Sequence, residues 1–192
     1  MKEQRRHQRI RFNVQPLVRM GQAGMTGLGR LENLSLGGLM VRTDLSLKSG
    51  EIFGCEFSLF GLYLIDIPAT VVGSVGELFS ARFQAGPISE TLLQDEMIRA
   101  LSSGRGSVLS VNELQGRRVM RIQGGLNESL RNDFLHGLKT GVDEIDLSRV
   151  TDIDLVGAEL CQTAMKRQIG IIRPVGRVSD EIAAAVGWRN GG

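Results

Sequence analysis

The sequence predicts two domains: an antiparallel β-barrel with a following helix, and then an α/β sheet with helices. Between residues 12 and 83, short apolar runs alternate with polar residues and are separated by glycine-rich turns, with no helical periodicity between them. From about residue 118, strand-like and helix-like segments alternate instead. Between the two patterns lies Ser102–Ser107, which has the composition of a linker. We therefore expect domains at residues 1–103 and 107–192.

In the first domain, residues 1–11 are too polar to fold alone and are expected to form a mobile arm. The four glycines within Gly21–Gly29 predict a loop between strands. A helix is expected to begin with a cap at Ser89–Glu90 and to end at Gly104. The predicted strands lie in Phe12–Met20, Leu31–Val41, Ile52–Leu64, Ile65–Val75 and Phe79–Phe83.

The second domain is expected to follow the order βαβαβα, in which right-handed crossovers connect parallel strands. Its helices are predicted from apolar residues at helical spacing, including Leu160, Ala164 and Met165 as inward-facing positions. The predicted elements in chain order are Arg118–Gln123, Asn127–Lys139, Glu144–Leu147, Leu155–Arg167, Ile169–Pro174 and a final helix from Ser179 to Gly187.

Composition excludes several classes of protein. The chain is 42% hydrophobic and 23% charged, which is typical of a soluble globular protein. No apolar stretch is long enough to span a bilayer and the polar start is no signal peptide, so a cytoplasmic location is expected. Two distant cysteines, Cys55 and Cys161, and two histidines predict neither a disulfide, nor a metal site, nor a nucleophile–base pair. We therefore expect a protein that is not an enzyme and has no cofactor.

The positive charge is concentrated at the start of the chain. The net charge is +2, but residues 1–11 carry five cationic side chains against Glu3, a net of +4, and the remaining residues sum to −2. This distribution favours a local anion site over a broad basic face for duplex nucleic acid.

Two short motifs point to the ligand of that site. Arg5 and Arg9 form an RxxxR pattern, and Asn33, Ser35 and Gly38 form an NxSxxG pattern ahead of an apolar run. Guanidinium groups bind phosphate in bidentate fashion, stack on aromatic planes and match the O6 and N7 acceptors of guanine. A ligand with phosphates and flat purine faces would suit this combination.

Together, and in this order, the two motifs resemble the PilZ domain, the bacterial receptor for cyclic di-GMP. The resemblance implies a cyclic di-GMP site in which arginines of the arm grip phosphate or guanine while the second motif binds from the barrel surface. It implies one or two nucleotides per domain, and an arm that becomes ordered over the barrel when the ligand binds. The implied ligand-binding residues are Arg5, Arg6, Arg9, Asn33, Ser35, Gly37 and Gly38.

The second domain resembles the STAS domain of anti-sigma-factor antagonists. Asp146–Ser148 matches the family's D-L-S strand end, and Asp154 and Gly157 match the first and last positions of its D-S-S-G motif. The two serine positions of that motif hold Leu155 and Val156 here, so the family's phosphorylation switch cannot operate at this place. An aspartate of this loop is expected to cap the following helix, and the domain is expected to contact a protein partner or a second copy.

Two other functions remain open from the sequence. One is a protein-interaction regulator with a degenerate nucleotide site. The other is a nucleic-acid binder that uses the basic arm, although only Phe12 lies near the arm as a stacking aromatic. The sequence does not indicate the downstream pathway or the oligomeric state.

Overall fold

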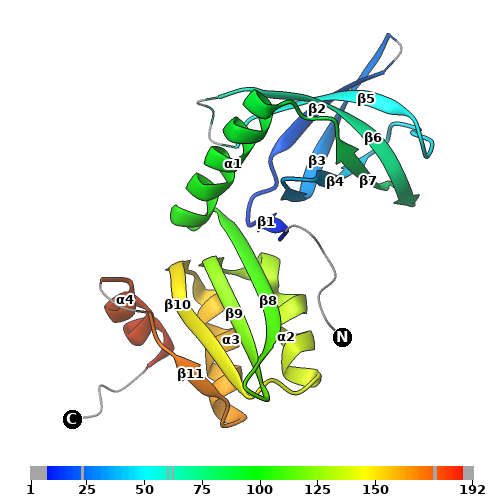
Figure 1. The fold of residues 1–192 in the computed structure, drawn as a ribbon. Helices are drawn as coiled ribbons and strands as arrows, with labels where there is room; N and C mark the ends of the chain where they lie inside the picture. The colour runs from blue at the N-terminus through cyan, green and yellow to red at the C-terminus, as the bar shows by residue number, and fades with distance from the viewer. Residues whose placement is uncertain (1–7, 23, 60, 62, 175–176, 188–192) are drawn as a thin grey trace. The chain divides into compact units, whose positions relative to one another are not determined.

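The computed structural model describes residues 8–22, 24–59, 61, 63–174 and 177–187 (Figure 1). The chain divides into two compact units, residues 6–100 and the segment from Leu101 onward. Among the described residues, no helix is both long and apolar enough to cross a membrane.

Six antiparallel strands of the first unit close into a barrel, as the sequence predicts. Around the barrel the order is β2–β5–β6–β7–β4–β3, and β3 pairs again with β2. The strands are β2 (Leu17–Gln22), β3 (Met25–Ser35), β4 (Gly38–Thr43), β5 (Ile52–Phe57), β6 (Ile65–Val75) and β7 (Leu78–Phe83). A short strand, β1 (Ile10–Phe12), pairs with the second half of β3.

The barrel is stabilised by side chains that alternate along each strand between its interior and its outer wall. Successive residues of a strand point to opposite faces, so every second position is removed from water. Phe57 and Phe83 stack in the interior with ring centroids 6.5 Å apart. Burial raises the pKa of the interior Cys55 thiol to about 12, so the thiol stays protonated at neutral pH. The fully buried interior residues include Val18, Met20, Leu31, Leu34, Val41, Phe53, Ile65, Ile67 and Val71.

Two expectations for this unit are wrong in part. The predicted arm of residues 1–11 ends earlier, because Ile10 and Arg11 already belong to β1 and Ile10 is 1% exposed. The predicted loop Gly21–Gly29 is mostly strand. Gly27 and Gly29 lie within β3, where an added Cβ would come within 2.7 Å of Leu45 and 2.5 Å of Val41, respectively. These glycines admit neighbouring side chains rather than form a turn.

Helix α1 (Pro87–Ser102) follows the barrel and begins two residues before the expected cap, with proline at its first position. Its buried face carries Leu93, Glu96 and Ala100, each 0% exposed. Both carboxylate oxygens of Glu96 are buried without a hydrogen-bond partner. Among the described residues, the Nε of Arg99 lies 3.9 Å from Glu96 Oε1. A buried carboxylate is therefore only weakly compensated.

The second unit is an α/β sheet in the order β11–β10–β9–β8, with β9, β10 and β11 parallel and β8 antiparallel to β9. Side chains of α2, α3 and α4 pack with β9 and β10 in one apolar core that includes Phe134, Ile145, Leu160 and Val186. The elements are β8 (Gly106–Leu114), β9 (Arg117–Leu126), a 3₁₀ turn η1 (Glu128–Leu130), α2 (Arg131–Lys139), β10 (Glu144–Ile153), α3 (Leu155–Lys166), β11 (Gly170–Ile172) and α4 (Arg177–Val186).

Strand β8 was not expected, because its Gly-Ser start resembles the linker before it. The observed order is therefore ββαβαβα, and only residues 103–105 separate α1 from β8. Met165 is the one wrong core expectation in α3, since it is 41% exposed while Leu160 and Ala164 are buried.

Candidate functional site

The β3–β4 hairpin brings the second sequence motif together on one edge of the barrel. Asn33 and Ser35 end β3, Gly37 lies in the turn, and Gly38 begins β4. Both polar side chains are 8% exposed. The Ser35 hydroxyl donates to the carbonyl of Gly38 at 3.1 Å, and Asn33 Nδ2 lies 3.4 Å from the sulfur of Met40. A ligand that used these groups would exchange these local contacts for its own.

The glycine of this motif is required by the barrel itself. A Cβ on Gly38 would lie 2.1 Å from the carbonyl oxygen of Ala81 on β7. The preceding Gly37 accepts a hydrogen bond from the backbone N–H of Phe83 at 3.1 Å. The turn is therefore packed directly on the backbone of β7, and a side chain at Gly38 would push the two strands apart.

Strand β1 brings Arg9, the last residue of the arginine motif, close to the same edge. Its antiparallel register pairs Ile10 with Leu34 and Arg11 with Asn33. Arg9 immediately precedes β1 and is exposed, and one further step of the same register would bring it opposite Ser35. Arg5 and Arg6 lie outside the described residues. Of the predicted site residues, the structure thus brings Asn33, Ser35, Gly37 and Gly38 together and leads Arg9 toward them.

Arg11 was not among the predicted site residues, although it lies beside Asn33. Residues facing each other across an antiparallel pair have Cβ atoms about 4.5–5.5 Å apart, so the two side chains are direct neighbours. The sequence contains a signal for this position: Arg9 and Arg11 alternate with the apolar Ile10 and Phe12, as on one face of a strand.

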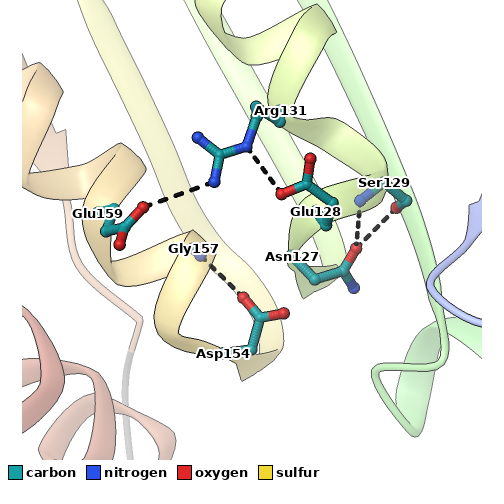
Figure 2. A network of polar contacts seen from close by, with 7 residues as sticks. All are labelled: Asn127, Glu128, Ser129, Arg131, Asp154, Gly157 and Glu159. Atoms are coloured by element: carbon teal, nitrogen blue, oxygen red, sulfur yellow. Dashed lines mark hydrogen bonds and ion pairs between the residues drawn. The ribbon is translucent and has the colours of Figure 1, made fainter.

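In the second unit, a polar network lies where η1 and α3 begin (Figure 2). Asp154 caps α3, as expected, by accepting a hydrogen bond from the N–H of Gly157 at 2.8 Å. Asn127 caps η1 in the same way, with Ser129 as donor.

The guanidinium of Arg131 bridges the two segments, 2.7 Å from Glu128 and 3.5 Å from Glu159. Beside this network, Leu155 is 83% exposed and carries no hydroxyl.

Asp146 holds the end of the D-L-S segment. Its Oδ1 accepts from the hydroxyl of Ser148 at 2.6 Å and from the backbone N–H of Ser148 at 3.0 Å, while Oδ2 lies 3.2 Å from Arg121 Nε. Burial raises the pKa of this carboxyl, but the hydrogen bonds from Ser148 and the charge of Arg121 outweigh burial and lower it overall.

Replacing Asp146 with asparagine is expected to lower the stability of the second unit by about 1 kcal/mol at pH 7, since the charge-assisted contacts are lost. The folded-state pKa lies below the unfolded value of 3.8, so this stabilisation is present above that pH and is lost as the pH falls further. Urea unfolding of both proteins at pH 7, 5 and 3 measures the difference. A difference that stays constant with pH would contradict the assignment.

The described part of the chain contains no group of three or more His, Cys, Asp or Glu side chains that could hold a metal ion. The fold and the site thus define a small antiparallel barrel with the second motif on one edge, followed in the chain by an α/β unit. The family model for the PilZ domain matches residues 3–101, half of the chain. The chain belongs to the PilZ domain family, whose members are receptors for cyclic di-GMP.

Several solved structures are similar to about half of this chain. They include the PilZ domain of YcgR from Escherichia coli with c-di-GMP (22% identity, TM-score 0.42, 48% of this chain and 87% of that one). YcgR from Escherichia coli in complex with c-di-GMP matches at 24% identity and a TM-score of 0.44, over 50% of this chain and 45% of that one. The K. pneumonia MrkH–c-di-GMP complex matches at 16% identity and 0.44, over 52% of each chain. No curated protein matches the chain. Family membership rests on the family model alone.

Proposed function

We propose that this chain is a cyclic di-GMP receptor without catalytic activity, in which the ligand draws the arginine arm onto the barrel edge. The observation that carries the proposal is the register of β1 against β3. This register sets Arg11 beside Asn33 and directs Arg9 toward Ser35. The end of the first motif and the second motif, more than twenty residues apart in sequence, thereby approach one edge of the barrel, where guanidinium groups can bind phosphate or guanine.

The energetics favour a ligand with several anionic and polar groups. Each arm residue that the ligand fixes costs roughly 1–2 kcal/mol of backbone entropy. Each charge-assisted hydrogen bond to a guanidinium contributes roughly 1.5–3 kcal/mol. A ligand with two phosphates and two guanines offers enough such bonds to offset the ordering of the arm. The new arm surface would then be the signal that a partner reads.

We further propose that residues 1–103 and 107–192 act as separate domains, the second a STAS-like interaction domain. The parallel strands β9, β10 and β11, the helices between them and the cap of Asp154 support this likeness. Leu155, exposed where that family carries a serine, supports protein contact without phosphorylation. A protein partner or a second copy of the chain would bind at this unit.

Calorimetric titration of the full chain tests the receptor proposal. Cyclic di-GMP is expected to bind, while GTP and cyclic di-AMP give no comparable heat, and the molar ratio distinguishes one nucleotide from two. Arg9→Ala is expected to weaken binding at least about tenfold, since it removes charge-assisted contacts. Arg19→Ala is the control, because Arg19 is exposed on β2 and lies 4.0 Å from Glu56.

Absence of binding in buffers of different ionisation enthalpy would contradict the proposal and would leave two protein-interaction modules. Equal affinities of Arg9→Ala and the wild-type protein would contradict the role of the arm.

A further inference from the structure

Arg82 lies on the outer wall of the barrel, close to the second motif. It is exposed between Ala81 and Phe83, which are 6% and 9% exposed and point into the barrel. The register pairs Arg82 with Gly38 on β4, and Gly38 in turn with Ser35 on β3. Ser35, Gly38 and Arg82 therefore form one cross-strand row.

The middle position of this row has no side chain. Adjacent strands lie about 4.8 Å apart, so Ser35 and Arg82 are separated by roughly 10 Å. No side chain of β4 stands between them at this level, because the residue there is Gly38. The row thus has the Ser35 hydroxyl at one end, the Arg82 guanidinium at the other, and no side chain between them.

Arg82 also differs from two other arginines of the barrel wall, Arg42 and Arg19, which lie near carboxylates. Arg42 lies 3.0 Å from Glu32, and Arg19 lies 4.0 Å from Glu56. Within the described residues, no carboxylate lies within ion-pair distance of Arg82. An exposed guanidinium without a carboxylate partner keeps its hydrogen-bond donors available for an anion.

We propose that Arg82 is a ligand-binding residue that contacts a phosphate of the nucleotide from the β7 side. The proposal rests on the cyclic di-GMP receptor function proposed above. The arginines that precede and enter β1 approach Ser35 from one side, and Arg82 approaches from the other. The site then spans four neighbouring strands, β1–β3–β4–β7, roughly 14 Å at 4.8 Å per strand. Such a span places cations on both sides of a ligand that carries two phosphates.

Calorimetric titration with cyclic di-GMP at two salt concentrations tests this role. Arg82→Gln is expected to weaken binding at least about tenfold and to reduce the salt dependence of the affinity, since one cation–phosphate contact is lost. Arg82→Lys, which keeps the charge, is expected to retain most of the affinity. Both variants should unfold at the wild-type urea concentration, because Arg82 is exposed.

Arg30→Gln is the matched control. Arg30 is also exposed on the barrel wall and has no carboxylate within ion-pair distance among the described residues, but it precedes Ser35 by five residues of β3, roughly 17 Å. Its substitution is expected to leave the affinity within about twofold. Wild-type affinity in Arg82→Gln, or an equal loss in Arg30→Gln, would overturn the role of Arg82 while leaving the receptor function intact. A wild-type protein that binds no cyclic di-GMP would overturn both.

Discussion

Replacing Gly38 with alanine is expected to destabilise the barrel unit by about 3 kcal/mol. The added Cβ would lie 2.1 Å from the carbonyl oxygen of Ala81, and the atom in its way belongs to the backbone of β7. A flexible side chain could turn aside, but β7 is fixed by its pairing with β4 and β6. Urea unfolding, followed by circular dichroism, measures the loss.

Gly21→Ala is the control for this substitution. Gly21 also lies in a barrel strand, but no atom lies within 4 Å of its added Cβ. Its substitution is expected to be neutral or slightly stabilising, since glycine weakens a strand through backbone entropy. Equal stabilities of the two variants would contradict the packing role of Gly38. If the role holds, weak nucleotide binding by Gly38→Ala reports a damaged barrel rather than a lost ligand contact.

Replacing Glu96 with leucine is expected to raise the stability of the first unit by about 1–4 kcal/mol. The Glu96 side chain is 0% exposed, neither of its oxygens has a hydrogen-bond partner, and Arg99 is 3.9 Å away. Leucine has a similar volume and would lie between Leu93 and Ala100 on the buried face of α1 without the desolvation cost of a carboxylate. The midpoint of urea unfolding measures the gain.

Glu90→Leu on the exposed side of the same helix is the control, with a change expected within about 0.5 kcal/mol. A loss of stability in Glu96→Leu would contradict the expectation and would indicate that the carboxylate is paired in solution. If the gain is found, the wild-type protein keeps Glu96 at a loss of stability. The nucleotide affinity of Glu96→Leu, compared with that of the wild-type protein, would then show whether Glu96 contributes to binding.

Local sequence signals predicted those elements whose pattern follows from burial on one face. Strands β6 and β7 were predicted almost to the residue, because Ile65, Ile67, Ala69 and Val71 alternate with polar residues. A helix from Leu155 with an aspartate cap was predicted, although the cap was left open between Asp152 and Asp154, since a helix cap depends only on residues of the next turn. These features need no knowledge of distant parts of the chain.

The features that the sequence did not predict depend on contacts between distant segments. Gly27 belongs to a strand because the side chain of Leu45 fills the space beside it, which no local pattern reveals. Strand β8 forms because it pairs with β9, whereas the Gly-Ser sequence at its start is typical of a linker. The neighbourhood of Arg82 and Gly38 follows from the register of β4 against β7, which lie some forty residues apart.

The short pairing of β1 with β3 fixes the position of Arg9 relative to the barrel, because Arg9 directly precedes β1. Because side chains alternate in a strand, one residue inserted between Arg9 and Ile10 would move Arg9 by about 3.4 Å along β3 and turn its side chain to the opposite face. An insertion before Arg5 would leave this phase unchanged. The length of the chain ahead of Arg5 therefore does not affect this register. The number of residues between Arg9 and β1, in contrast, decides which face of the strand the Arg9 side chain lies on.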